Sequence, residues 1–128
     1  MIFGVGTDLV QVERIQATYE RFGEHFVDRL LMPEERGLFD PGRRAARFLA
    51  MRFAAKEAIA KALGTGFRHG VWIRDFGFVP DVRGRPQVIF SARGRAVADG
   101  LGAGDGHVSL TDEAGLVVAF AVLMRKGA

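Results

Sequence analysis

The sequence predicts an α+β fold in which an antiparallel sheet packs against one long central helix. Three observations lead to this prediction: one long helical stretch, short strand-like segments that follow one another along the chain, and turn residues between those segments. Runs of antiparallel strands packed against helices are typical of α+β domains. A chain of 128 residues is expected to form a single domain, here spanning residues 1–128.

The helical stretch runs from Arg47 to Gly66 and consists mostly of strong helix formers. Asp40-Pro41 is typical of a helix start, because a capping residue precedes a proline at the first helical position. Gly64 is the expected stop, since glycine readily takes the left-handed conformation that ends a helix. The predicted core-facing stripe is Phe48, Leu49, Ala55, Ile59, Ala62 and Leu63, while Phe53, Glu57 and Lys61 share another face.

The elements on either side of this helix are short. Before it we expect a strand over 2–7, helices over about 11–22 and 25–32, and a helix start at Pro33. After it we expect strands over 71–79 and 87–90, a helix over 91–101 capped by Ser91, a loop over 102–106, and strands over 107–110 and 116–124. The last strand is strongly apolar and should be central. The strand over 71–79 has two partly apolar faces, one expected to meet the long helix and the other a second subunit.

Composition restricts the possible functions. The chain has no cysteine, which excludes a disulfide framework and a thiolate metal site. No signal peptide and no apolar run long enough to span a membrane are seen, so we expect a cytoplasmic protein without a membrane partner. The net charge is +3, and the 18 cationic residues are mostly arginine, whose planar guanidinium suits phosphate and carboxylate. An anionic partner is therefore expected, although such a surface also serves solubility alone.

Two carboxylates stand out as candidates for chemistry. Asp8 is expected at the end of the first strand, where it would either cap the next helix or hold a metal. Glu57 and Lys61 are spaced as an i, i+4 pair, which alone would be a weak surface ion pair. If Asp8 and Glu57 converge, they offer hard oxygen ligands of the kind that Mg²⁺ uses together with phosphates and water. Lys61 would then stand one helical turn from the metal and contact a phosphate.

Phosphate contacts are also predicted elsewhere. Arg43, Arg44, Arg47 and Arg52 form the densest basic cluster, which is either a solvated helix face or a phosphate clamp. The loop Gly64-Thr65-Gly66 would let a ligand approach the backbone closely. His107 begins a strand and is not assigned a role from its position alone.

Three motifs stand out along the chain: GVGTDLV at 4–10 with Arg14-Ile15, RFAAKEA at 52–58 continuing through KALGTG at 61–66, and HVSLT at 107–111. Together they resemble the holo-acyl-carrier-protein synthase family of 4′-phosphopantetheinyl transferases. The resemblance covers essentially the whole chain, and its most specific part is the RFAAKEA segment. Two departures are visible. Val10 stands where larger relatives carry a second metal-binding acid, and Thr111-Asp112 stands where some members have Ser-His, so no role is assigned to Asp112.

The resemblance implies an enzyme that moves phosphopantetheine from coenzyme A to a serine of an acyl carrier protein in fatty acid or polyketide biosynthesis. The other product would be adenosine 3′,5′-bisphosphate. Asp8 and Glu57 would bind Mg²⁺, Glu57 and Lys61 would act in catalysis, and either Glu57 or a water on the metal would accept the serine proton. The implied coenzyme A contacts are Arg44, Arg47, Arg52, Lys61, Gly64, Thr65 and His107.

The resemblance also implies an assembly and a docking surface. Family members are homotrimers whose coenzyme A sites lie between subunits, so the arginines and His107 would serve a shared site. Arg14 and Arg21 match the positive helix that docks the acidic carrier protein.

Two other functions were weighed against this one. A nucleic-acid-binding module would use the Arg-Arg-x-x-Arg-Phe run, but the aromatic residues fall mostly at core-like positions, and we expect no nucleic-acid partner. A purely structural oligomerisation domain would explain the two-faced segment at 71–79 without requiring Asp8 or Glu57.

Overall fold

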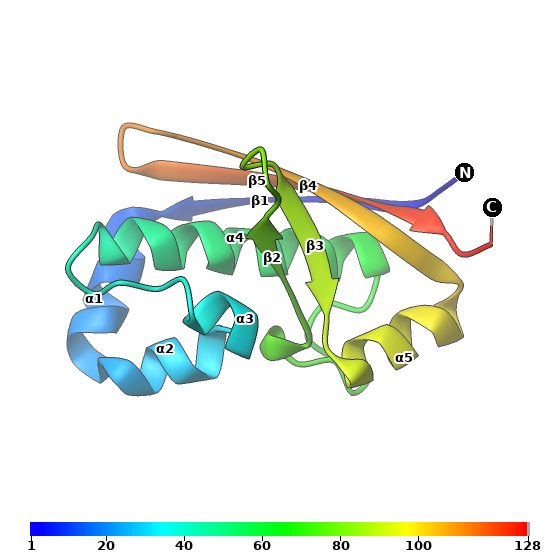
Figure 1. The fold of residues 1–128 in the computed structure, drawn as a ribbon, viewed down its shortest axis with the longest axis horizontal. Helices are drawn as coiled ribbons and strands as arrows, with labels where there is room; N and C mark the ends of the chain where they lie inside the picture. Colours follow the sequence, from blue (N-terminus) through cyan, green and yellow to red (C-terminus); the bar gives the residue numbers. More distant parts are fainter. Residues whose placement is uncertain (128) are drawn as a thin grey trace.

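A five-stranded antiparallel sheet with strand order β1-β5-β4-β3-β2 lies across the long helix α4 in this computed structural model, which describes residues 1–127. Figure 1 shows the sheet as one layer and the helices on one side of it. The elements are β1 (Ile2–Gln11), α1 (Val12–Phe22), α2 (Glu24–Leu30), α3 (Pro33–Arg36), α4 (Ala45–Leu63), η1 (Ile73–Asp75), β2 (Phe76–Pro80), β3 (Pro86–Phe90), α5 (Ala92–Leu101), β4 (Ala103–Glu113) and β5 (Leu116–Arg125). The predicted α+β class is confirmed.

The core lies between α4 and the inner face of the sheet. Small alanines of α4 and alternate residues of β5 are almost fully buried there, among them Ala54, Ala58, Val117, Ala119 and Ala121. The helix comes so close to β1 that the strand has glycine at the contact. A Cβ on Gly4 would lie 2.0 Å from the Ala62 carbonyl oxygen, and a Cβ on Gly6 would lie 2.0 Å from that of Ala58. Both positions therefore require glycine, which fixes the register of β1 on α4.

The opposite face of the sheet is apolar and exposed. We define the outer face by Val5, Leu9, Val118 and Phe120, which alternate with the inward-facing residues of β1 and β5. Leu9 is 62% exposed and Phe120 is 47% exposed. Side chains of one strand alternate between the two faces, so β1 presents Leu9 outward and its neighbour Asp8 inward. Contiguous exposed apolar patches of this kind mark interaction surfaces.

Several element boundaries differ from the predictions. The helix start predicted at Asp40-Pro41 is wrong, because α4 begins at Ala45 after Arg44, whose φ is +47°. Asp40 instead accepts a hydrogen bond from the Gly42 N–H at 2.8 Å and closes a turn. The predicted stop at Gly64 is confirmed, with φ +83°.

The first strand is longer than predicted and reaches Gln11, so Asp8 lies within β1 rather than at its end. The segment over 71–79 is not one strand. Its first part forms the 3-10 helix η1, because the Asp75 carboxylate accepts a hydrogen bond from the Trp72 N–H at 2.8 Å. The predicted loop over 102–106 is the irregular beginning of β4, which pairs with β5.

Two further predictions agree with the structure. Ser91 caps α5 by accepting a hydrogen bond from the Gly94 N–H at 2.9 Å. β5 is an interior strand that pairs with β1 on one side and β4 on the other. Across residues 1–127, none of the helices combines the length and the hydrophobicity that a membrane span requires.

Candidate active site

Asp8 and Glu57 line the same cavity, although they come from a strand and a helix almost fifty residues apart. The cavity has a volume of about 620 Å³, and its lining includes Arg14, Phe26, Phe53 and Leu116. The glycine contacts of β1 on α4 bring the two carboxylates together, because Gly6 lies two residues before Asp8 and Ala58 follows Glu57. The predicted convergence of Asp8 and Glu57 on one site therefore holds within a single chain.

Lys61 is held against Asp8 rather than against Glu57. Its Nζ donates a hydrogen bond to the Thr7 carbonyl oxygen at 2.9 Å and lies 3.3 Å from the Asp8 carboxylate. The side chain of Lys61 is 53% exposed. The alternative of a simple surface ion pair between Glu57 and Lys61 does not describe this arrangement, which places an ammonium group beside the cavity.

The electrostatics of the cavity act mainly on Glu57. Partial burial raises the pKa of the Glu57 carboxyl above its usual value, and the negative charge of Asp8 raises it further. Lys61 acts in the opposite direction and lowers this pKa. A cation bound here would offset the repulsion that Glu57 meets from Asp8, so the site is suited to bind one.

The donor set of the cavity fits a hard divalent cation. Carboxylate oxygens are the ligands that Mg²⁺ takes from proteins, usually one or two of them, with water and phosphate oxygens completing its shell. Within residues 1–127, no group of three or more His, Asp or Glu side chains is arranged to hold a metal. The carboxylates that this cavity would offer a metal are therefore those of Asp8 and Glu57.

The predicted arginine cluster is divided among different environments. Arg43 and Arg44 are exposed in the turn before α4. The Arg47 guanidinium forms a two-bond pair with Asp112, from Nε at 2.8 Å and from one terminal nitrogen at 2.9 Å. Hydrogen bonding from Arg47 holds the pKa of the Asp112 carboxyl below its usual value. Asp112, which has no role assigned from the sequence, thus ties the β4–β5 hairpin to the start of α4.

Arg52 is buried, with only 8% of its surface exposed. Its guanidinium lies between the rings of Phe48 and Phe78, at 4.0 Å and 4.1 Å from their centroids. A single solvated face made of all four arginines, as a phosphate clamp or a nucleic-acid surface would need, is therefore not formed. The coenzyme A contacts of Arg44, Arg47 and Arg52 stay predictions.

The other predicted ligand-binding residues lie away from the cavity within one chain. Gly64 ends α4, and the Thr65 hydroxyl donates a hydrogen bond to the Gly66 carbonyl at 2.8 Å. His107 lies exposed on β4, opposite Gln87 of β3, with its Nδ1 3.5 Å from an Arg85 nitrogen. These residues stay predicted contacts of coenzyme A.

Sequence reasoning missed the buried ion pair of Glu35 and Lys56. Glu35 follows the helix start expected at Pro33, and Lys56 lies within the RFAAKEA motif, so neither position by itself indicates a buried pair. One signal was available: Arg52 and Lys56 are spaced i, i+4 on an otherwise apolar part of the helix. Two cations in that position require a buried acid from another element.

Comparisons with known proteins identify the family of this chain. Residues 4–119 match the family model described as the 4′-phosphopantetheinyl transferase superfamily. The holo-[acyl-carrier-protein] synthase of Halorhodospira halophila is 51% identical over 126 residues, which cover 97% of this chain and 98% of the relative.

Two solved structures of holo-[acyl-carrier-protein] synthases are also similar. The one from Neisseria meningitidis superposes with a TM-score of 0.91 at 38% identity, covering 98% of this chain and 100% of that one. The one from Helicobacter pylori, in complex with coenzyme A, has a TM-score of 0.81 at 27% identity, covering 93% of this chain and 98% of that one. A chain with this fold, with a paired aspartate and glutamate in one cavity and with matches along nearly its whole length, belongs to the holo-[acyl-carrier-protein] synthases of the 4′-phosphopantetheinyl transferase superfamily.

Proposed function

We propose that this chain catalyses the magnesium-dependent transfer of 4′-phosphopantetheine from coenzyme A to a serine of an apo acyl carrier protein, with release of adenosine 3′,5′-bisphosphate. The observation that carries the proposal is the shared cavity of Asp8 and Glu57, with Lys61 held against Asp8. The family assignment and the coenzyme A bound in the Helicobacter pylori relative support the choice of substrate.

Asp8 and Glu57 would hold the magnesium ion. When bound, the ion supplies charge neutralisation and orientation for the pyrophosphate of coenzyme A. Lys61 would bind a phosphate oxygen and stabilise the charge that develops there, since its ammonium group lies beside the carboxylates and is half exposed. Transfer of a phosphoryl-type group depends largely on such positioning and charge stabilisation.

The attacking serine must lose its proton. Either Glu57 or a water bound to the metal would accept this proton, since both would stand in the cavity that the serine enters. Phe53 and Phe26 line the same cavity from α4 and α2.

The carrier protein would dock on α1. Arg14 is exposed and lines the cavity, so an acidic partner bound there would bring its serine to the Asp8–Glu57 pair. Arg21 is exposed two turns further along α1, with its guanidinium 5.1 Å from the Phe22 ring centroid. Exposed arginines beside the cavity would guide an acidic carrier to the site and fix its register.

The active assembly would be a homotrimer that buries the outer face of the sheet. The exposed apolar residues of β1 and β5 support an oligomer, because a large apolar patch rarely stays in water. Arg44, Arg47, Arg52, Gly64, Thr65 and His107 would then contribute to coenzyme A sites shared between neighbouring subunits.

The decisive experiment combines coenzyme A, Mg²⁺ and an apo carrier protein, and follows the mass of the carrier. The wild-type chain should add one phosphopantetheine group to the carrier, and omission of Mg²⁺ should stop the transfer. Glu57→Gln should abolish the transfer while the fold is kept, and Glu113→Gln, at an exposed position, should leave it unchanged. Near-normal turnover by Glu57→Gln would reject the assignment of Glu57.

A further inference from the structure

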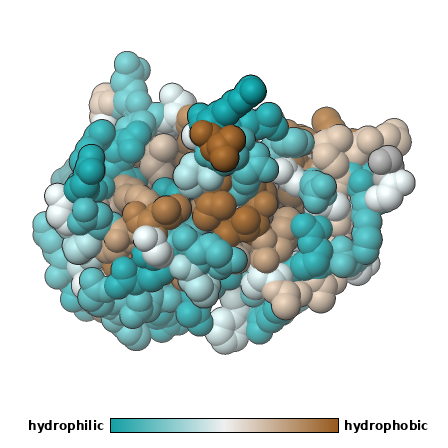
Figure 2. Space-filling model, in the orientation of Figure 1, coloured by the Kyte–Doolittle hydropathy of each residue, from teal (hydrophilic) through white to brown (hydrophobic). Residues whose placement is uncertain are grey.

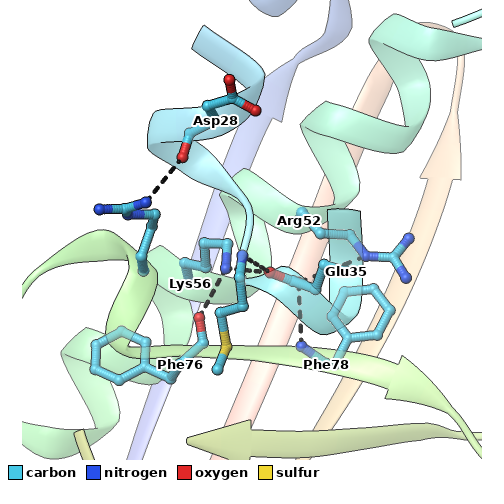
Figure 3. A network of polar contacts seen from close by, with 8 residues as sticks. Asp28, Glu35, Arg52, Lys56, Phe76 and Phe78 are labelled. Atoms are coloured by element: carbon cyan, nitrogen blue, oxygen red, sulfur yellow. Dashed lines mark hydrogen bonds and ion pairs between the residues drawn. The ribbon is translucent and has the colours of Figure 1, made fainter. Parts of the chain in front are cut away.

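The side chains of Glu35 and Lys56 form an ion pair that is completely buried, with no exposed surface on either side chain. Lys56 Nζ lies 2.5 Å from Glu35 Oε1, and it also donates a hydrogen bond to the Phe76 carbonyl oxygen at 2.7 Å. Figure 3 shows the ammonium group between the carboxylate and this carbonyl. The pair thus connects α3 and α4 to β2.

The remaining lone pairs of Glu35 are also used. Oε1 accepts a hydrogen bond from the Met32 N–H at 3.0 Å, and Oε2 accepts one from the Phe78 N–H at 3.2 Å. Gly77 lies directly over the carboxylate, and a Cβ at this position would stand 2.5 Å from Glu35 Oε2. The backbone of β2 is therefore fitted to this one side chain from Phe76 to Phe78.

Arg52 strengthens the same connection one helical turn before Lys56. Its Nε lies 3.6 Å from Glu35 Oε2, and its guanidinium is enclosed by a ring of α4 and a ring of β2. Burial lowers the pKa of Arg52 to about 10, so this group stays charged at neutral pH. Both cations of α4 therefore hold β2 through Glu35.

In Figure 2, apolar surface lies across the middle of the visible face, with hydrophilic residues around it.

The β2–β3 hairpin is paired only over a short stretch with the rest of the sheet, although Phe76 and Phe78 also pack into the core. Within residues 1–127, the ladder between β3 and β4 has a single paired position, Gln87 opposite His107, whereas β4 and β5 pair along nearly their whole length. The hairpin carries Arg85, whose guanidinium lies 3.5 Å from His107. Lys56 is also the residue before Glu57, so one helix holds both the hairpin and the cavity carboxylate.

We propose that Glu35 and Lys56 are positioning residues, which set the place of the β2–β3 hairpin and of its Arg85–His107 contact relative to Glu57 on α4. The proposal rests on the proposed function for one part only, the assignment of His107 to the coenzyme A site. A well-packed apolar pair often keeps the stability that a buried ion pair gives, but it lacks the directed bonds that specify one arrangement. Here the pair also bonds backbone groups of β2, so it would set the geometry of the coenzyme A site and contribute to the stability of the fold.

The test variant is the double substitution Glu35→Leu with Lys56→Met, which removes both charges and keeps apolar bulk at both positions. We expect it to melt at a lower temperature than the wild type, because the Met32 and Phe78 N–H groups lose their acceptor and Arg52 loses its counter-charge. Its KM for coenzyme A should rise about tenfold while kcat changes much less, because binding contacts are displaced and the cavity of Asp8 and Glu57 is not. Glu34→Gln, which changes the exposed neighbour of Glu35, should leave both constants unchanged.

A second measurement does not depend on activity. Because the chain has no cysteine, Val82→Cys in the exposed hairpin turn and Gln16→Cys on α1 can be spin-labelled without background. Pulsed electron paramagnetic resonance, with labelled chain diluted in unlabelled chain, should give a narrow distance distribution in the parent protein. In the double variant the distribution should broaden or shift.

The outcomes separate the two proposals. An unchanged distance distribution together with an unchanged KM would overturn the positioning role. A changed distance distribution in the double variant, together with a wild-type chain that shows no transfer, would uphold the positioning role and reject the proposed function. If the double variant does not fold, Glu35→Gln takes its place. The amide oxygen of the substituted side chain can still accept the hydrogen bond from Lys56, but the amide nitrogen at the place of Oε2 cannot accept one from the Phe78 N–H. For Glu35→Gln we expect a smaller broadening of the distance distribution and a smaller rise in the KM for coenzyme A. The absence of both effects would count against the proposal.

Discussion

Gly6 of β1 meets the Ala58 carbonyl of α4 so closely that a Cβ on residue 6 would stand 2.0 Å from that oxygen. This contact sets the distance between the strand that carries Asp8 and the helix that carries Glu57. The predicted pairing of these two carboxylates depends on a glycine that has no chemistry of its own.

Substitution Gly6→Ala should therefore lower both stability and activity. Overpacking at a rigid backbone contact costs about 1–3 kcal/mol, and the strand must move away from α4 to relieve it. Chemical denaturation and the magnesium dependence of transfer measure the two effects. Gly100→Ala is the matched control, because no atom lies within 4 Å of the added Cβ and the residue is in helix α5. A Gly6→Ala protein as stable and as active as the control would contradict the contact.

Glu57 should reduce the stability of the protein at neutral pH when no divalent cation is present. Its pKa is raised in the folded state by burial and by Asp8, so the folded protein binds this proton more tightly than the unfolded chain. The resulting stability is present below the unfolded pKa and is lost as the pH rises through the folded pKa. Glu57→Gln should thus raise the melting temperature at pH 7, and the difference should shrink at acidic pH. A variant that melts lower than wild type at pH 7 would oppose this reading of the site.

Lys61→Met should have opposite effects on metal binding and on turnover. Lys61 lies 3.3 Å from the Asp8 carboxylate, so its loss removes a charge that competes with a divalent cation. The magnesium concentration needed for half-maximal activity should fall, while kcat drops about a hundredfold through the loss of a group that stabilises developing charge. Titration of the transfer reaction with Mg²⁺ gives both values. If the variant needs more magnesium for half-maximal activity, Lys61 does not compete with the metal for the Asp8 carboxylate.

Arg14→Glu should weaken the binding of the carrier protein and leave the binding of coenzyme A unchanged. Arg14 lines the cavity from α1, so a reversed charge would repel an acidic partner at the point where its serine enters. The KM for the carrier should rise about tenfold and should lose part of its dependence on salt. Arg125→Glu, a charge reversal at the end of β5, serves as the control. An unchanged KM for the carrier would remove α1 from the docking surface.

Phe120→Asp should prevent assembly through the outer face. Phe120 is 47% exposed beside other apolar residues of β1 and β5, and a charge there would be buried on association. Analytical ultracentrifugation should find the wild type as a trimer and the variant as a monomer, with far-ultraviolet circular dichroism unchanged. A wild-type chain that sediments as a monomer would remove the basis for coenzyme A sites shared between subunits.

The sequence was most informative where the pattern is local. The end of α4 at Gly64, the cap of α5 by Ser91 and the apolar strand β5 each depend on a few neighbouring residues, and each agrees with the structure. The helix start predicted at Asp40-Pro41 was wrong because the Asp40 side chain accepts a backbone hydrogen bond in a turn, as it would also do as a helix cap. The 3-10 turn at η1 was missed because the hydrogen bond from the Trp72 N–H to Asp75 overrides the alternation of the segment.

The site was predictable in part. Asp8, Glu57 and Lys61 were found because their motifs carry a family resemblance, and the structure brings all three together. The Glu35–Lys56 pair was not found, because its partners are 21 residues apart and their contact depends on how α3 and β2 pack on α4. The cytoplasmic location stays a prediction.

The alternation of β1 makes this strand unusually sensitive to insertions and deletions. Asp8 faces inward and Leu9 faces outward, and β1 pairs with β5 without a break from Gly4 to Gln11. A change of one residue in length between Gly6 and Asp8 would turn the carboxylate to the outer face and a hydrophobic side chain into the cavity. The catalytic and the assembly surfaces would then be lost in the same event, so this short segment should tolerate exchange of residues far better than any change in their number.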